Sequence, residues 1–103
     1  MPSLAQLSAI VERTAQYHLE IDYGGLGLCS EAGEVAGELK KVIRNDHGVL
    51  TEERCAKIAS ELGDVLWYTQ FIANMIGYTI PEIVHILDDK LSSRLENGTI
   101  NER

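Results

Sequence analysis

The sequence predicts an all-α fold: a four-helix bundle-like subunit of antiparallel helices that assembles into a homo-oligomer. Apolar residues recur at helical spacing along the chain, and no segment alternates apolar and polar residues for long. Both prolines, Pro2 and Pro81, stand where a helix would begin. The 103 residues suffice for one domain, which we assign to 1–103. Short connections between four helices favour antiparallel neighbours, and a core this small favours self-association.

The first two expected helices are separated by a break that contains two glycines. Ser3 can cap the first helix, because its hydroxyl can accept a backbone N–H at a helix start. The run Asp-Tyr-Gly-Gly at 22–25 is expected to end that helix. A second helix is expected over 26–44, where apolar residues recur at intervals of three and four. The turn-forming cluster at 45–48 then ends it.

The third and fourth helices have clear start and stop signals. Thr51 can cap a third helix whose first turn is acidic, as the helix dipole favours. This helix is expected to continue to Ile76 and to stop at Gly77. Pro81 in a first turn indicates the restart. The Asn-Gly pair at 97–98 is typical of a helix end.

The third helix is apolar on two sides. One stripe consists of Ile58, Leu62, Val65, Ile72 and Ile76, whereas Trp67 and Phe71 lie well away from it. A helix that is apolar on two sides is usually buried on two sides. Its second contact is either another helix of the same subunit or a partner subunit.

The acidic composition excludes several functions. Nine basic residues stand against sixteen acidic ones, for a formal charge of −7. This argues against binding to a nucleic-acid polymer or to an anionic membrane surface. No signal peptide or transmembrane run is visible, so we expect a cytoplasmic protein. Cys29 and Cys55 form no CxxC pair, and we expect two buried free thiols.

Acidic pairs recur on two consecutive helices. Glu31 and Glu34 are three residues apart on the second helix, and Glu61 and Asp64 are three apart on the third. Glu38 lies one further turn along the second helix. If the apolar stripes pack as an antiparallel hairpin, these carboxylates border the seam and repel one another without a counter-ion. A hard divalent cation, Mg²⁺ or Mn²⁺, would resolve that repulsion. The alternative is a solvated acidic helix surface.

Two further features accompany the acidic pairs. Gly33 and Gly63 each lie inside a pair, where a helical glycine costs about 1 kcal/mol relative to Ala. They indicate either close helix approach or access for a ligand. Without the five carboxylates named above, eleven acidic residues would face nine basic ones. The excess charge is therefore concentrated in this region.

The ordered motifs resemble those of the MazG-like family of all-α nucleoside triphosphate pyrophosphohydrolases. The E-x-x-E motif is Glu31-Ala-Gly-Glu34, and after twenty-six residues E-x-x-D is Glu61-Leu-Gly-Asp64. The run from Lys90 to Arg94 is similar to the family's K-L-x-x-R signature. Leu87 stands where many relatives have Asn. The resemblance extends over roughly residues 4 to 98.

This resemblance implies hydrolysis of a nucleoside triphosphate between its α and β phosphates, yielding a monophosphate and pyrophosphate. It also implies a role in clearing non-canonical or surplus nucleotides, with Mg²⁺ as cofactor and Mn²⁺ as a substitute. The implied catalytic and metal-binding residues are Glu31, Glu34, Glu61 and Asp64, with Glu38 as a weaker ligand. The resemblance also implies phosphate contacts by Lys90, Arg94 and Lys41. It implies base contacts by Tyr68, Trp67, His18 and Tyr17. The alternative function is a non-catalytic helical oligomerisation or metal-binding regulatory module.

Overall fold

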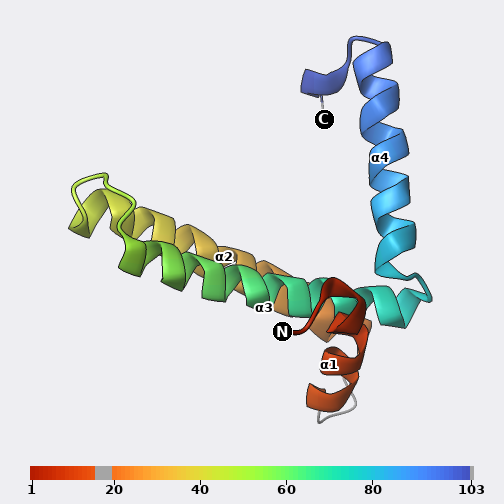
Figure 1. The fold of residues 1–103 in the computed structure, drawn as a ribbon, viewed down its shortest axis with the longest axis horizontal. Coiled ribbons are helices and arrows are strands. Elements are labelled where there is room, and N and C mark those ends of the chain that lie inside the picture. The colour runs from red at the N-terminus through yellow and green to blue at the C-terminus, as the bar shows by residue number, and fades with distance from the viewer. Residues whose placement is uncertain (16–19, 103) are drawn as a thin grey trace. The chain divides into compact units, whose positions relative to one another are not determined.

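The structure, a computed structural model, describes residues 1–15 and 20–102, and these residues form helices and no strands (Figure 1). In order, the elements are the 3-10 helix η1 (Leu4–Gln6), α1 (Leu7–Thr14), α2 (Ile21–Asn45), α3 (Glu52–Ile76), α4 (Ile80–Glu96) and the 3-10 helix η2 (Ile100–Glu102). The predicted all-α class is confirmed. The chain divides into two compact units, Met1–Ile72 and Ala73–Arg103, and each is described by itself. The four-helix bundle arrangement stays a prediction.

The predicted starts of α3 and α4 are confirmed by their capping hydrogen bonds. The Thr51 hydroxyl accepts the backbone N–H of Arg54 at 3.1 Å, within the first turn of α3. At α4 the Thr79 hydroxyl accepts the backbone N–H of Glu82 at 3.2 Å, and the Glu82 carboxylate accepts the backbone N–H of Thr79 at 3.0 Å. Between these two caps, Gly77 ends α3 with a φ of +80°, a conformation that glycine adopts without strain.

The predicted break at 22–25 is wrong, because α2 begins at Ile21 and continues through both glycines. Gly24 is buried, and a Cβ built on it would lie 3.0 Å from the Phe71 ring. The missing side chain therefore lets α2 approach α3 closely at this level. Burial against Phe71 offsets the low helix propensity of glycine, which local sequence signals cannot show.

Helices α2 and α3 form an antiparallel hairpin in which they lie side by side (Figure 1). Among the buried and half-buried residues of both helices, one set recurs at intervals of three and four, as in paired helices. We call these positions the seam. They are Leu28, Glu31, Val35, Glu38 and Val42 of α2, and Arg54, Ile58, Glu61, Val65, Tyr68 and Ile72 of α3. Three carboxylates thus lie in the seam itself rather than beside it.

Helix α1 contacts α3 through the Trp67 side of that helix. The Trp67 indole N–H donates to the Thr14 hydroxyl at 2.7 Å. The Trp67 ring stacks on the buried Phe71 ring, with centroids 5.5 Å apart and planes inclined by 8°. On this side, the second contact expected for α3 is therefore made within the same chain.

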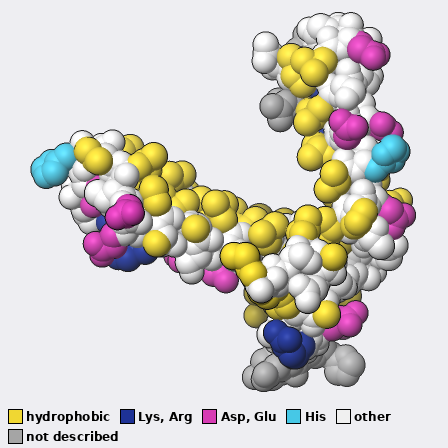
Figure 2. Space-filling view, viewed as in Figure 1, with side chains coloured by type: hydrophobic (Ala, Val, Ile, Leu, Met, Phe, Trp, Pro, Cys, Tyr) yellow, Lys and Arg dark blue, Asp and Glu magenta, His cyan; other side chains and the backbone are white. Residues whose placement is uncertain are grey.

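The hairpin has one apolar flank that no described residue of the first unit covers. Figure 2 shows hydrophobic side chains along its length. Exposure reaches 78% at Ile43, 47% at Leu39 and 48% at both Leu62 and Leu66. The members of this apolar flank are Cys29, Ala32, Ala36, Leu39 and Ile43 of α2, and Cys55, Ala59, Leu62 and Leu66 of α3.

The prediction of two buried thiols is wrong in one respect. Cys29 and Cys55 are free, but both are exposed. The reason is their position on the apolar flank, which faces away from the seam. Apolar neighbours in sequence indicated a buried helix face, but no described residue of the first unit packs against this face.

Helix α4, in the second unit, ends in a glycine-stabilised terminus, as the sequence predicts. The backbone N–H of Thr99 donates to the Arg94 carbonyl at 2.8 Å, and Gly98 has a φ of +71°. Lys90 and Arg94 lie one turn apart on α4. Among the described residues, no helix combines the length and the apolar character needed to cross a membrane.

Candidate active site

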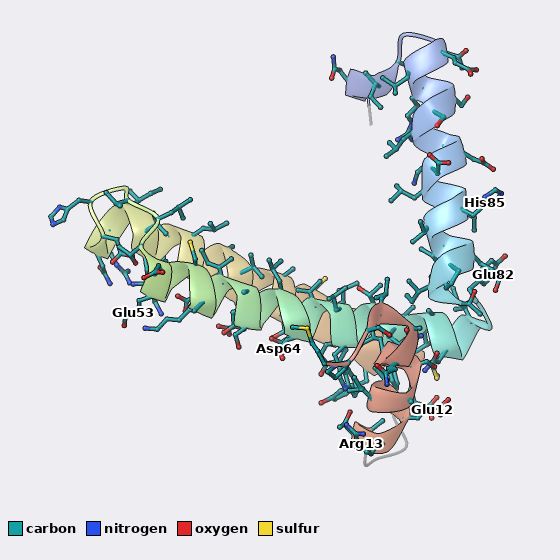
Figure 3. The ribbon with its side chains drawn as sticks, viewed as in Figure 1. Glu12, Arg13, Glu53, Asp64, Glu82 and His85 are labelled. Carbon is teal, nitrogen blue, oxygen red and sulfur yellow. The ribbon has the colours of Figure 1, made fainter. Side chains whose placement is uncertain are left out.

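Three carboxylates from α2 and α3 converge at the seam. Glu31, Glu61 and Asp64 each place one oxygen within 4.8 Å of the other two. Glu31 and Glu61 are half-buried, whereas Asp64 is exposed and points outward from α3 (Figure 3). We call these three residues the acidic cluster. Convergent carboxylate oxygens are the donor set that Mg²⁺ and Mn²⁺ prefer.

Burial and mutual repulsion of the carboxylates both act on Glu61. Burial is the main factor that raises the pKa of Glu61, and the carboxylates of Asp64, Glu34, Glu31 and Glu38 raise that pKa further. Each of these factors disfavours the ionised carboxylate. A divalent cation among the same oxygens would reverse this balance, so the residues fit the metal that the motifs predict.

Glu34 and Glu38 lie near the acidic cluster without being part of it. Glu34 is exposed, one turn along α2 from Glu31. The Glu38 carboxylate accepts a hydrogen bond from Arg54 Nη1 at 2.6 Å and one from Lys41 Nζ at 3.5 Å. The hydrogen bond from Arg54 is the main factor that lowers the pKa of Glu38. Glu38 is therefore an ionised but paired carboxylate, and its predicted role as a weaker ligand stays a prediction, as does phosphate binding by Lys41.

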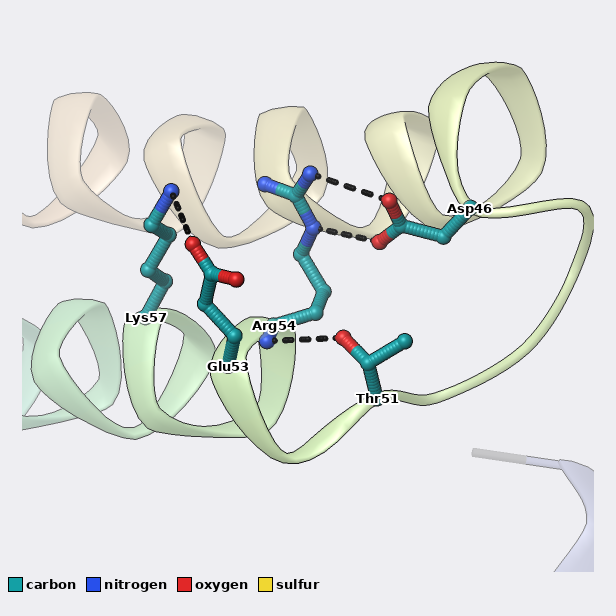
Figure 4. A pocket seen from close by; sticks show the side chains of 5 residues that line it. All are labelled: Asp46, Thr51, Glu53, Arg54 and Lys57. Carbon is teal, nitrogen blue, oxygen red and sulfur yellow. Dashed lines mark hydrogen bonds and ion pairs between the residues drawn. The ribbon is translucent and has the colours of Figure 1, made fainter.

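Arg54 joins Glu38 to the end of the hairpin. Its Nε donates to Asp46 Oδ2 at 2.8 Å, and Figure 4 shows this pair with the Thr51 cap beside it. Arg54 is only 9% exposed although it carries a charge. Hydrogen bonds to Asp46 and Glu38 raise the pKa of Arg54 above its usual range. The seam thus ends in a buried cation bound by two carboxylates.

Two recesses adjoin the acidic cluster. The first has a volume of about 290 Å³ and is lined by Glu31, Asp64, Trp67 and Tyr68. The second has a volume of about 350 Å³. We call the second the Tyr23 recess; its lining residues are Tyr23, Leu26, Gly27, Ser30, Glu31 and Tyr68. Glu31 and Tyr68 therefore border both recesses.

Sequence reasoning missed part of the Tyr23 recess. Tyr23 received no role, because the expected break at 22–25 separated it from the helix that carries the acids, whereas Leu26 and Ser30 were placed in that helix without a role in the site. One signal could have revealed them. Gly24 and Gly27 are three residues apart, and both would contact α3 if the helix were continued through them.

The residues predicted to contact the base and the phosphates lie in different parts of the chain. Trp67 and Tyr68 are half-buried and line the first recess, so their predicted base contact stays a prediction. Tyr17 and His18 lie outside the described residues. Lys90 and Arg94 belong to the second unit.

The two glycines inside the acidic pairs do not mark close helix approach. No atom of the described residues lies within 4 Å of a Cβ built on Gly33 or Gly63. Close helix approach is therefore wrong for both glycines within the described residues, and access for a ligand stays a prediction.

Comparison with known proteins identifies the family. The family model of the MazG nucleotide pyrophosphohydrolase domain matches residues 25–99, a range that contains all three motifs. The Gene 37 protein of Mycobacterium phage L5 is 38% identical over 80 residues, which cover 78% of this chain and 70% of that protein. No solved structure matches the chain. The chain belongs to the MazG nucleotide pyrophosphohydrolase family.

Proposed function

We propose that the chain is a cytoplasmic, Mg²⁺-dependent pyrophosphohydrolase that converts (d)NTP to (d)NMP and pyrophosphate and removes non-canonical or surplus nucleotides. The observation that carries this proposal is the convergence of Glu31, Glu61 and Asp64 beside an aromatic-walled recess, in a chain of this family. A metal-binding cluster next to an apolar surface is the combination that a triphosphate with an attached base requires.

In this proposal, the carboxylates bind the cation and an aromatic side chain contacts the base. Glu31, Glu61 and Asp64 would hold the cation. Glu34, whose charge raises the pKa of Glu61, stays a predicted ligand. A bound Mg²⁺ ion supplies positive charge to the phosphates and makes water a stronger acid. Tyr68 supports the proposed base contact from a position that borders both recesses. Phosphate binding by Lys90 and Arg94, which lie one turn apart on α4, stays a prediction from the K-L-x-x-R motif.

The bond that is cleaved determines which products form, so product analysis tests this proposal. Each dNTP and NTP is incubated with the protein and Mg²⁺, and phosphorus NMR identifies the products. We expect monophosphate and pyrophosphate in equal amounts, and no reaction when EDTA removes the metal. Orthophosphate with a nucleoside diphosphate, or no product from any nucleotide, would contradict the proposal.

Self-association is the second part of the proposal, and the apolar flank supports it. Exposed Leu and Ile side chains continuous over two helices are typical of an interface. A second copy of the chain would cover this flank and leave the acidic cluster open, since Glu34 and Asp64 lie on the other side of the seam.

The change Leu62→Glu tests this part, because it places a charge in the middle of the apolar flank. Light scattering after size exclusion is expected to give a multiple of 11.4 kDa for the natural chain and a smaller species for the variant. Val49→Glu, at an exposed loop position outside the flank, is the matched control and should leave the mass unchanged. A natural chain at the monomer mass under micromolar conditions would refute self-association.

The apolar flank also favours the alternative, a non-catalytic helical oligomerisation or metal-binding regulatory module. That alternative predicts no pyrophosphate from any nucleotide, with saturable Mg²⁺ binding only in the metal-binding case. The product analysis above therefore separates the two functions.

A further inference from the structure

The ring of Tyr68 lies directly against the backbone of α2 at Gly27. A Cβ built on Gly27 would overlap the Cε1, Cζ and Cδ1 atoms of that ring. By contrast, a Cβ built on Gly25, in the same helix, meets no atom within 4 Å. Only one of these two glycines is therefore required by packing, and it is the one beneath Tyr68.

Two other aromatic residues hold the same ring. The Tyr23 ring lies one turn before Gly27, with its centroid 6.4 Å from that of Tyr68 and a tilt of 40°. The Trp67 ring meets Tyr68 edge-on, with centroids 4.9 Å apart. Burial, then a hydrogen bond with Tyr23, and then the charges of Tyr23, Glu31 and Asp64 raise the pKa of the Tyr68 hydroxyl. Tyr68 is thus fixed at the boundary between the acidic cluster and the Tyr23 recess.

The two recesses differ in chemistry on either side of this ring. The first has carboxylates of Glu31 and Asp64 among its four lining residues. The Tyr23 recess has only Glu31 as a charged member, at the edge it shares with the first. Its other walls are aromatic, aliphatic or hydroxyl-bearing, and Leu26 and Tyr23 are 73% and 50% exposed. A flat heteroaromatic ring with polar edges matches these walls, because aromatic faces bind its plane and hydroxyls bind its edge.

We propose that the Tyr23 recess is the nucleobase subsite, that Tyr23 and Ser30 select the base, and that Gly27 is the positioning residue that seats Tyr68 between base and phosphates. This inference rests on the proposed function and adds to it the place of the base. Because Glu31 and Tyr68 border both recesses, one ligand could span them. Its phosphates would lie by Glu31 and Asp64, and its base would lie beyond Tyr68.

The matched pair Gly27→Ala and Gly25→Ala tests the positioning role. Both changes remove a helical glycine, but only Gly27→Ala displaces the Tyr68 ring. For Gly27→Ala we expect KM for the preferred nucleotide to rise about tenfold, the order of one lost base–aromatic stack. The kcat and the affinity for Mn²⁺ should change less than KM, since the acidic cluster is untouched. Gly25→Ala should leave both kinetic constants unchanged.

The change Ser30→Leu tests the recess without disturbing Tyr68, because it fills the recess from the exposed side of α2. We expect a higher KM and an altered ranking of the four dNTPs, with helix content by circular dichroism unchanged. Tyr23→Phe, which keeps the ring and removes the hydroxyl, should change the ranking alone.

The outcomes separate this inference from the function on which it rests. If the natural chain hydrolyses nucleotides but Gly27→Ala and Ser30→Leu keep its KM and ranking, the subsite is wrong and the function stands. If the natural chain hydrolyses none, both are wrong. If Ser30→Leu changes the molecular mass instead of the ranking, the recess is occupied by a second copy of the chain, and the subsite is again wrong.

Discussion

Replacing Glu61 with Gln is expected to reduce Mg²⁺-dependent pyrophosphate release by at least about a hundredfold, since loss of a group that merely supports a metal ligand costs about 10- to 100-fold. Gln keeps the shape of the side chain but removes the negative charge. Glu61 is the half-buried centre of the acidic cluster, and all four neighbouring carboxylates act on it. Steady-state pyrophosphate release at saturating Mg²⁺ measures the effect.

The matched control is Glu53→Gln, on the same helix. Glu53 is 84% exposed at its side chain and pairs with Lys57 at 3.8 Å, a contact of little energetic weight. This variant should keep the activity of the natural chain. Equal activity of both variants would show that Glu61 does not belong to the site.

Glu61→Gln should raise the stability of the metal-free protein, although it lowers activity. The folded state raises the pKa of Glu61, so its ionised form destabilises the fold at neutral pH and its protonated form does not. In metal-free buffer, Glu61→Gln should therefore melt at a higher temperature than the natural chain at pH 7. The difference should shrink as the pH falls through the raised pKa of Glu61 and should vanish below the usual glutamate value of 4.5.

Replacing Arg54 with Met is expected to produce the largest loss of stability of any single change discussed here. The guanidinium is the common partner of Glu38 and Asp46, at 2.6 and 2.8 Å, where all three side chains are at least four-fifths buried. Met keeps most of the aliphatic volume, but it leaves two poorly solvated carboxylates without a cation. The melting temperature should fall by several degrees. Lys57→Met, which breaks an exposed pair, is the control and should have little effect.

The ion pairs of Arg54 also predict an acid-sensitive component of stability. Hydrogen bonds from Arg54 lower the pKa values of both Glu38 and Asp46 from their usual 4.5 and 3.8. A lowered folded-state pKa contributes stability that is present above the usual value and is lost as the pH falls through the lowered one. The natural chain should therefore lose stability below about pH 5. Arg54→Met should lose less over this range, and parallel pH profiles would contradict the ion-pair account.

Local sequence signals predicted where α3 and α4 begin better than they predicted where α2 begins. The caps at Thr51 and Thr79 depend on hydroxyls and neighbours within one turn, so the sequence contains all that they require. The start of α2 depends on Gly24 and its burial against Phe71, forty-seven positions along the chain. No local rule for glycine includes that contact, and the expected break was therefore wrong.

The same contrast applies to the candidate site. Spacing of three residues placed Glu61 and Asp64 on one helix face, and the antiparallel hairpin brought them to Glu31. The shorter hydrogen bond to Glu38 could not be predicted from spacing, because its donor Arg54 belongs to the other helix and reaches across the seam. Side-chain partners across a seam depend on register, which the apolar pattern specifies only approximately.

The central claim is that Glu31, Glu61 and Asp64 hold the divalent cation that receives the triphosphate. Titration with Mn²⁺, followed by electron paramagnetic resonance of the free ion, tests it in the absence of substrate. We predict saturable binding that Mg²⁺ displaces, that Glu53→Gln retains and that Glu61→Gln loses while keeping its helix content. Equal Mn²⁺ binding by Glu61→Gln and the natural chain would contradict the claim.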